Sequence, residues 1–283
     1  MIGSGTGLDG FSAIVTGGGS GIGLGCARRL VADGASVTIV GRTEERLVAA
    51  VEELAPLAAD GATVQHAVAD VTDEDAIAAA VAHATEPTGG LDAAVACAGG
   101  SETLGPITQM DVDAWRRTID LNVTGTMLTI KHAARPMARS GRGAIVGISS
   151  IASSRTHRWF GAYGPGKAGI DHLCKVAADE LGASGVRVNS IQPGLVDTDL
   201  VSFVTAGGAV LDSYFENMPI ARVGTVDDIA SCARFLVGPE STWITGQAIG
   251  VDGGHSLRAG PDYGSLLEPL YGPEGMRGIV DPS

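Results

Sequence analysis

The sequence predicts an α/β protein with a Rossmann-type, doubly wound parallel sheet of about seven strands and helices on both faces. Three observations support this fold class. Short apolar runs rich in β-branched residues alternate with longer amphipathic stretches, as expected for buried parallel strands joined by helical crossovers. The 42 glycines are not periodic and cluster at turns between the apolar runs. A chain of 283 residues with 45% hydrophobic content suits one large three-layer domain.

Seven apolar runs are the expected strands, at residues 11–15, 37–40, 64–69, 93–96, 144–148, 186–191 and 248–251. The amphipathic stretches between them, rich in Ala, Leu, Glu and Arg, are the expected helices, at 22–33, 44–59, 74–84, 112–139, 162–183 and 226–236. The composition shows no repeat, linker or break before residue 254. We therefore expect residues 1–254 to form a single domain.

Two stretches depart from this alternation. Residues 197–221 are a long insertion with aromatic side chains among glycines, and insertions near the carboxyl ends of strands often act as lids. Residues 255–283 are a C-terminal extension that mixes prolines with hydrophobic residues. The extension is either a disordered end or a segment that packs on a neighbouring subunit.

Composition excludes several classes of partner. The net charge of −13 argues against nucleic acid, which needs a basic patch, and against an anionic membrane surface. No apolar run reaches the roughly 18 residues of a membrane span, and the N-terminus lacks signal-peptide features, so we expect a cytoplasmic protein. The four widely spaced cysteines favour reduced thiols and no metal site.

A glycine-rich loop at residues 16–23 follows the first expected strand and opens the first expected helix. In this context Gly17 allows a sharp turn, Gly21 lets the backbone approach a pyrophosphate, and Gly23 permits close helix–strand packing. The helix N-terminus offers free N–H groups and a positive dipole to phosphates. The loop, with Gly19, Ser20 and Ile22, is therefore predicted to bind a dinucleotide; the alternative is a flexible Gly/Ser turn.

The end of the second strand predicts the choice of dinucleotide. An acidic residue there would bind the ribose 2′-hydroxyl of NAD, but this chain has Gly41 followed by Arg42, whose guanidinium suits a 2′-phosphate. This favours NADP(H) over NAD(H). Alternatively, Arg42 stacks on adenine and pairs with Glu44 or Glu45. Asp70, followed by Val71, either accepts a hydrogen bond from the adenine amino group or caps the next helix.

Tyr163 and Lys167 are four residues apart and share one face of an expected helix. A nearby ammonium stabilises phenolate and would lower the tyrosine pKa toward the range a general acid/base needs. Ser150 follows a buried strand at the edge where α/β sites form, thirteen positions before Tyr163. Asn122 lies inside the expected helix 112–139, where a buried Asn suggests a specific hydrogen bond.

Taken in order, these motifs resemble the compact, single-domain branch of the short-chain dehydrogenase/reductase family over roughly residues 9–254. The resemblance implies a Tyr163 acid/base, a Lys167 that lowers its pKa and binds ribose, a Ser150 that positions substrate, and an Asn122 that holds a proton-relay water. It also implies a homotetramer, with 112–139 and 162–183 at one interface. The further cofactor contacts it implies are Asp70, Val71, Cys97, Ala98, Gly99, Pro193, Gly194, Val196 and Thr198.

Three features depart from the family pattern. Cys97 stands where Asn is usual, Gly164-Pro165-Gly166 separates Tyr163 from Lys167, and the extension after Gly254 is long. Because Pro is tolerated only in a first turn, that helix is expected to start near Ala162.

The segments around the site predict the substrate. The loop 151–160 is expected to border it, together with Leu195, Leu200, Phe203, Val204, Phe215 and Met218. This mostly apolar lining favours a hydrophobic ketone or secondary alcohol. Arg155, His157 and Arg158 could receive an anion, or lie at the surface or a subunit contact. A dinucleotide-sensing regulator without turnover is the alternative function, and the chain is too short for the larger substrate domain of a sugar-nucleotide epimerase.

Overall fold

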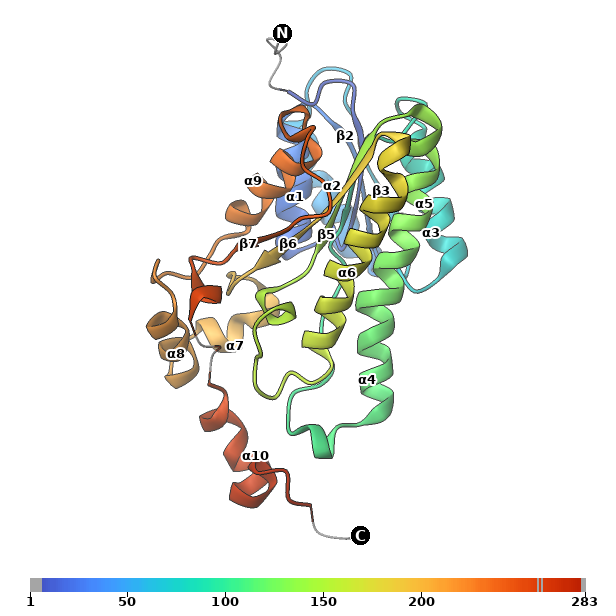
Figure 1. The fold of residues 1–283 in the computed structure, drawn as a ribbon. Coiled ribbons are helices and arrows are strands. Elements are labelled where there is room, and N and C mark those ends of the chain that lie inside the picture. The colour runs from blue at the N-terminus through green and yellow to red at the C-terminus, as the bar shows by residue number, and fades with distance from the viewer. Residues whose placement is uncertain (1–6, 259, 261, 281–283) are drawn as a thin grey trace.

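A computed structural model of the chain describes residues 7–258, 260 and 262–280. Its centre is a seven-stranded parallel sheet with the order β3-β2-β1-β4-β5-β6-β7 (Figure 1). The strands are β1 Ser12–Thr16, β2 Ser36–Gly41, β3 Val64–Val68, β4 Ala93–Ala96, β5 Gly143–Ile148, β6 Val186–Pro193 and β7 Ala248–Val251. The fold class and all seven expected strands are confirmed, with ends that differ by two residues at most.

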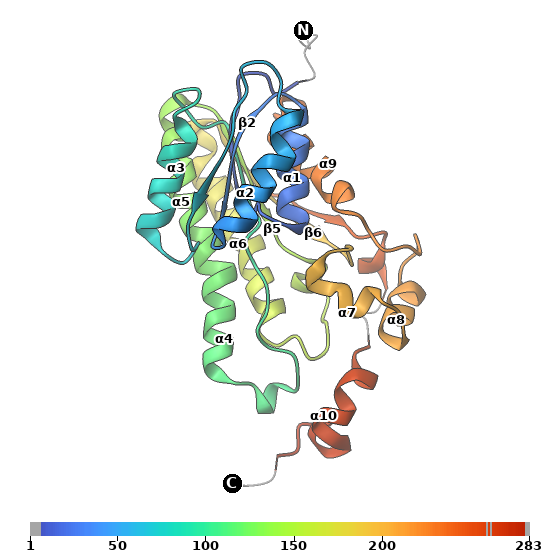
Figure 2. The ribbon, with the colours of Figure 1, turned by 180° about the vertical axis from the view of Figure 1, so that it is seen from behind.

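Helices cover both faces of the sheet, and each face buries its own apolar cluster. On one face lie α1 Gly21–Ala32, α2 Glu44–Leu54 and α9 Val226–Val237, packed around Leu30, Ile39 and Leu236 (Figure 2). On the other face lie α3 Glu74–Thr85, α5 Gly125–Ser140 and α6 Tyr163–Leu181, while α4 Val112–Ile119 extends beyond the sheet and contacts α6. Because strands of the sheet centre are buried on both sides, their inner residues are apolar in succession rather than alternating with polar ones.

The helix expected over 112–139 is interrupted. Residues Asp120–Thr124 form a π-helical turn between α4 and α5, and Asn122 lies in it, fully buried. Such turns widen a helix locally and are frequent at functional sites. The helix expected over 44–59 is shorter than predicted: α2 ends at Leu54, two residues before Pro56, and the short 3₁₀ turn Ala55–Leu57 follows.

The two irregular stretches fold together beyond the carboxyl end of β6. The insertion contains α7 Ser202–Thr205 and α8 Ala209–Asn217, and the extension contains α10 Gly264–Met276, which is kinked at Gly272 (Figures 1 and 2). They share a third apolar cluster, made by Leu195, Val204, Tyr214, Met218, Tyr263 and Leu267. The extension thus packs on its own chain, and contact with a neighbouring subunit stays a prediction.

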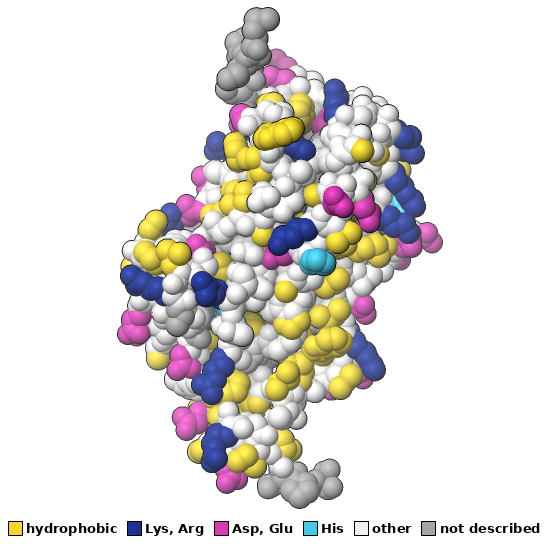
Figure 3. Space-filling model, in the orientation of Figure 1, with side chains coloured by type: hydrophobic (Ala, Val, Ile, Leu, Met, Phe, Trp, Pro, Cys, Tyr) yellow, Lys and Arg dark blue, Asp and Glu magenta, His cyan; other side chains and the backbone are white. Residues whose placement is uncertain are grey.

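Apolar side chains gather over α4 and α6 on the surface that faces the viewer in Figure 3. Across the described residues, no helix combines the length and apolar character needed to cross a membrane. Within the same ranges, His, Cys, Asp and Glu side chains form no group of three or more that could hold a metal ion.

Candidate active site

The glycine loop between β1 and α1 has close contacts that only glycine allows. Gly17 has φ of 68°, and a Cβ there would lie 3.0 Å from the Ala98 nitrogen. A Cβ at position 23 would lie 2.2 Å from the Gly17 carbonyl oxygen, so the helix start packs directly on the loop. Ser20 precedes α1 in extended conformation, and the first N–H groups of any helix lack partners within it. The loop therefore fits a dinucleotide pyrophosphate.

The neighbouring strand end is tied to this loop. The Thr16 hydroxyl, at the end of β1, accepts hydrogen bonds from the backbone nitrogens of Cys97 (3.1 Å) and Ala98 (3.3 Å) after β4. Burial raises the pKa of the Cys97 thiol to about 11, so this thiol is neutral at ordinary pH. The backbone of Cys97 thus ties the end of β4 to the end of β1, and Ala98 lies against Gly17 at the point where the strand order reverses.

Arg42 and Asp70 lie side by side at the ends of β2 and β3. Arg42 Nη1 is 3.8 Å from Asp70 Oδ2, and its side chain is 70% exposed. The alternative pairing of Arg42 with Glu44 or Glu45 is not what the structure shows. Asp70 accepts hydrogen bonds from the Thr72 nitrogen and hydroxyl, which lower its pKa. The alternative role of Asp70 as a helix cap is also wrong, since Asp73 caps α3 by accepting from Ala76 N.

Tyr163 is the first residue of α6, and Lys167 follows one turn later. Pro165 stands in the first helical turn, as predicted, where its missing N–H costs no hydrogen bond. Lys167 Nζ lies 5.6 Å from the centre of the Tyr163 ring and donates to the Ile148 carbonyl oxygen at 2.9 Å. Ser150 follows β5, so the end of this strand orients both the lysine and the serine.

Asn122 and Lys167 converge on Gly99. A Cβ at position 99 would lie 2.8 Å from Asn122 Oδ1 and 2.9 Å from Lys167 Nζ. Asn122 Nδ2 donates to the carbonyl oxygens of Gly100 and Thr118, both at 2.7 Å, and Oδ1 accepts from Gly100 N at 3.3 Å. The Asn122 side chain therefore fixes the loop after β4, and the water that the family resemblance assigns to this residue stays a prediction.

Burial dominates the protonation of the two central groups. Enclosure of the phenol raises the pKa of Tyr163, and a hydrogen bond with Ser150 opposes this rise. Burial lowers the pKa of Lys167 from 10.5 to about 8. The lowered Tyr163 pKa expected from the sequence is therefore not observed. The physical reason is that desolvation acts on both groups and disfavours both the phenolate and the ammonium.

The end of β6 leads toward the glycine loop. Gly194 N donates to the Val251 carbonyl oxygen after Pro193, and Val196 pairs with Gly224 in an isolated bridge. A methyl of Thr198 would lie 3.4 Å from a Cβ at Gly21, so this segment crosses to the start of α1. The predicted cofactor residues after β6 and those of the glycine loop thus lie next to each other, with Thr198 beside Gly21.

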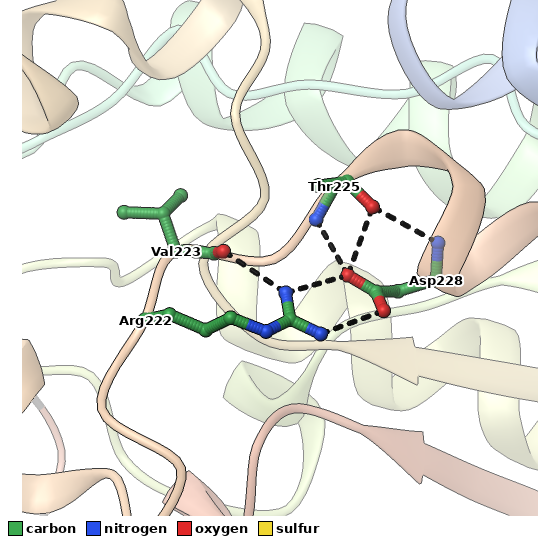
Figure 4. A network of polar contacts seen from close by, with 4 residues as sticks. All are labelled: Arg222, Val223, Thr225 and Asp228. Atoms are coloured by element: carbon green, nitrogen blue, oxygen red, sulfur yellow. Dashed lines mark hydrogen bonds and ion pairs between the residues drawn. The ribbon is translucent and has the colours of Figure 1, made fainter.

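A polar network at the start of α9 holds this crossing (Figure 4). Arg222 donates two hydrogen bonds to the Asp228 carboxylate, both at 2.8 Å. Asp228 also accepts from the nitrogen and hydroxyl of Thr225, and this capping box begins the helix directly after Gly224. These donors hold the pKa of Asp228 well below its usual range. The network anchors the partner of Val196.

Aromatic residues lie over Tyr163. Phe160 belongs to the loop 151–160 that was expected to border the substrate, whereas Tyr214 and Tyr263 behind it were not expected at the site. The Phe160 ring lies 5.8 Å from the Tyr163 ring and 5.0 Å from the Tyr263 ring. Tyr214 and Tyr263 are buried, and their hydroxyls are 3.0 Å apart. The only sequence signal for Tyr263 was the apolar and aromatic content of an extension without a motif.

Not every residue expected around the substrate lies inside. Leu195, Val204, Phe215 and Met218 belong to the third apolar cluster, but Leu200 and Phe203 are 66% and 56% exposed. Helix α7 has four residues and buries only Val204, so the expectation that Leu200 and Phe203 border the substrate stays a prediction. In the loop before α6, Arg158 stacks on Trp159, 4.6 Å from the ring centre, and is exposed.

Known proteins match this chain along most of its length. Residues 17–256 match the family model described as enoyl-(acyl carrier protein) reductase. Cis-4-hydroxycyclohexanecarboxylate dehydrogenase of Sinomonas cyclohexanicum is 38% identical, over 86% of this chain and 96% of that protein. Galactitol 2-dehydrogenase of Cereibacter sphaeroides is 33% identical, over 88% of this chain and 96% of that protein.

Solved structures match as well. A short-chain type dehydrogenase/reductase from Mycobacterium ulcerans is 54% identical, with a TM-score of 0.95 over 97% of this chain and 100% of that chain. A 7α-hydroxysteroid dehydrogenase complexed with NADH and 7-oxo glycochenodeoxycholic acid is 32% identical, with a TM-score of 0.83 over 90% of this chain and 98% of that chain. A Burkholderia cenocepacia short-chain dehydrogenase in complex with NADP is 34% identical, with a TM-score of 0.79 over 88% and 98%.

Proposed function

The chain belongs to the short-chain dehydrogenase/reductase family, and on that premise we propose that it interconverts a hydrophobic ketone and its secondary alcohol with NADP(H), using Tyr163 as general acid/base. The chain is an oxidoreductase that acts on alcohols or ketones with a nicotinamide dinucleotide. The observation that carries this proposal is the convergence of Asn122 and Lys167 on Gly99. Lys167 lies one helical turn after Tyr163 on α6, so the three side chains belong to one site.

The dinucleotide site is argued from the fit of the protein to phosphate. The glycine loop leaves no room for a Cβ at Gly23, and the start of α1 offers N–H groups to a pyrophosphate. Asp70, Val71 and the segment 97–99 would border the adenosine half. Pro193, Gly194, Val196 and Thr198 would border the nicotinamide half, and the bound dinucleotide would supply the hydride.

The preference for NADP(H) rests on Arg42. Its guanidinium is mostly exposed at the end of β2, and its ion pair with Asp70 spans 3.8 Å, a long separation for a firm contact. A 2′-phosphate could therefore accept two hydrogen bonds from the Arg42 guanidinium, and no buried ion pair would have to break. Homologues bind NADH or NADP, so the assignment depends on this residue and not on the family.

The proton moves at the Tyr163 hydroxyl. With its pKa raised, Tyr163 is protonated at neutral pH and is ready to donate to the oxygen of a bound ketone. Ser150, which hydrogen-bonds to Tyr163, would hold that oxygen in place. Lys167, with a pKa of about 8, titrates close to neutrality and can return a proton toward Tyr163 after each turnover.

The lining supports a hydrophobic substrate. Leu195, Val204, Met218 and Leu267 are buried in the cluster that covers the carboxyl end of β6, and Phe160 contacts Tyr163 directly. Such a lining favours alicyclic or longer apolar skeletons over polyols. Residues 197–221 would open and close over this side of the site as a lid.

A homotetramer is part of the proposal. Helices α4, α5 and α6 carry exposed Val112, Trp115, Met127 and Val176. Figure 3 shows apolar side chains gathering over α4 and α6. Exposed apolar patches of this kind mark interfaces in soluble proteins. Light scattering coupled to gel filtration gives the mass directly, and a monomer at micromolar concentration would contradict the assembly.

The proposed reaction is tested by following NADPH absorbance with a panel of alicyclic ketones and with the corresponding alcohols and NADP. We expect turnover of at least one apolar ketone and a preference for NADPH. Tight NADPH binding without turnover of any carbonyl or alcohol would instead support a dinucleotide-sensing regulator.

A further inference from the structure

Five aromatic rings form a closed circle beside Tyr163, which we call the aromatic collar: His157, Phe160, Tyr214, His255 and Tyr263. The ring centres are separated by 6.0 Å (His157–Phe160), 5.0 Å (Phe160–Tyr263), 6.4 Å (Tyr263–Tyr214), 5.2 Å (Tyr214–His255) and 6.0 Å (His255–His157). All five contacts are edge-to-face, the arrangement that aromatic rings prefer. The collar is therefore a packed unit and not a chance grouping of side chains.

The collar joins three segments of one chain. His157 and Phe160 precede α6, Tyr214 lies on α8, and His255 and Tyr263 come from the extension. Hydrogen bonds among the described residues hold the extension there, including those from Arg258 Nη1 to Glu216 O (2.9 Å), from Asp262 N to Ser213 Oγ (3.1 Å) and from Tyr271 Oη to Leu104 O (3.1 Å). The match to the family model ends at residue 256, so Tyr263 is a feature beyond the shared domain.

The polar part of the collar is the pair of tyrosine hydroxyls. Tyr214 Oη and Tyr263 Oη are 3.0 Å apart, and the two residues are 6% and 3% exposed. Each hydroxyl carries one hydrogen, so the bond between them uses one donor, and the described part of the chain shows no other acceptor for the second. Burial raises the pKa of both phenols, which therefore stay neutral. The pair offers one O–H donor and spare lone pairs in an apolar cluster with Leu195, Val204 and Leu267.

The pair is close to the reacting centre. Phe160 contacts both the Tyr163 ring and the Tyr263 ring, at 5.8 and 5.0 Å. Burial is the main cause of the raised pKa values of Tyr163 and Tyr214; Tyr263 adds to the first and Tyr163 to the second, so the three phenols lie within electrostatic reach of one another. Tyr263 is thus separated from Tyr163 by the Phe160 ring, and a substrate whose ketone oxygen is held at Tyr163 would have the Tyr263–Tyr214 hydroxyls as a second hydrogen-bonding group nearby.

We propose that Tyr263 and Tyr214 form a neutral hydrogen-bonding subsite that binds a second oxygen of the substrate, a hydroxyl or keto group on a compact hydrophobic skeleton. This inference rests on the proposed function, since it assigns the substrate class of the same site. A carboxylate would be a poor occupant, because a buried anion between two neutral phenols would lose its hydration without gaining a cation. Burial also lowers the pKa of His157, so this member of the collar favours its neutral form.

The test uses the full chain with NADPH and two matched pairs of ketones: cyclohexanone with 4-hydroxycyclohexanone, and 4-phenylcyclohexanone with 4-(4-hydroxyphenyl)cyclohexanone. The variants are Tyr263→Phe and Tyr214→Phe, and Tyr271→Phe is the matched control in the same extension. We use the pair in which the wild type favours the hydroxylated ketone more strongly. For that pair, the kcat/KM of the hydroxylated ketone divided by the kcat/KM of the plain ketone should fall about fivefold in Tyr263→Phe and in Tyr214→Phe. The change should lie in KM, and Tyr271→Phe should leave the ratio unchanged.

The outcomes separate the subsite from the reaction. If the wild type reduces the plain ketones but the ratio is the same in Tyr263→Phe and Tyr214→Phe, the subsite is refuted and the proposed function stands. If no ketone is reduced, the proposed function fails, and ligand-observed NMR decides the subsite: the hydroxylated ketone should bind more weakly to both variants, and equal binding refutes it. A preference for 4-oxocyclohexanecarboxylate over 4-hydroxycyclohexanone would also overturn the neutral character of the subsite.

Discussion

Replacing Lys167 with methionine should make the protein more stable at neutral pH while it destroys activity. Lys167 is 4% exposed, its ammonium donates to the Ile148 carbonyl oxygen at 2.9 Å, and burial lowers its pKa from 10.5 to about 8. A lowered lysine pKa means that the folded state binds this proton less tightly than the unfolded state does. The buried charge therefore costs folding free energy, and methionine fills a similar volume without it.

The size of the effect follows from that pKa. A fall from 10.5 to about 8 corresponds to a cost of roughly 3 kcal/mol, at 1.36 kcal/mol for each pKa unit. Methionine cannot donate to the Ile148 carbonyl oxygen, and the loss of this hydrogen bond reduces the stabilisation by about 1 kcal/mol. We expect Lys167→Met to raise the free energy of unfolding by about 2 kcal/mol at pH 7.

The pH dependence distinguishes a charge effect from better packing. Below pH 8 the lysine is protonated in both states and the full cost is present; above 10.5 it is neutral in both and the cost vanishes. The stability gap between variant and wild type should therefore shrink as pH rises through this window. It should be close to zero near pH 9.5, where the remaining charge cost of roughly 1 kcal/mol is cancelled by the lost hydrogen bond to Ile148.

Urea unfolding at fixed protomer concentration, at pH 7 and 9.5, measures the gap. Lys175→Met, at an exposed position of the same helix, is the control and should change stability by less than about 0.5 kcal/mol. A Lys167→Met protein that is no more stable than wild type at pH 7, or a gap that does not depend on pH, would refute the reasoning.

Two further substitutions test the contacts on either side of the site. Gly99→Ala places a Cβ 2.8 Å from Asn122 Oδ1 and 2.9 Å from Lys167 Nζ, so kcat should fall at least about 100-fold with an unchanged circular dichroism spectrum; a near-normal kcat would mean that this convergence is not needed. Arg42→Ala should weaken NADPH binding about tenfold or more and leave NADH binding unchanged in fluorescence titrations; equal losses for both dinucleotides would contradict the assignment of Arg42 to a 2′-phosphate.

The sheet could be predicted from the sequence because its centre is buried on both faces. Strands such as Ala93–Ala96 and Gly143–Ile148 are apolar throughout, and this signal is local. The glycine loop was equally readable, since its glycines are required by contacts within the loop and with the next strand end. Motif order then identified the residues that converge around Lys167.

The remaining features depend on tertiary contacts that no local pattern encodes. The π turn at Asp120–Thr124 comes with hydrogen bonds of Asn122 to Gly100, a residue 22 positions away. The pKa of Tyr163 depends on enclosure by the folded chain, which outweighs its hydrogen bond to Ser150. Tyr263 reaches the site only because the extension folds back over α8, and its sequence, broken by prolines, carries no periodic signal for that path.

The central claim is that Tyr163 supplies the proton while the rest of the site holds the dinucleotide. The direct measurement compares wild type and Tyr163→Phe in NADPH binding and in reduction of a ketone that the wild type turns over. We predict NADPH affinity within about twofold and turnover reduced by at least about 100-fold, the scale of general acid catalysis. Turnover by Tyr163→Phe at more than a few per cent of the wild-type rate would contradict the claim.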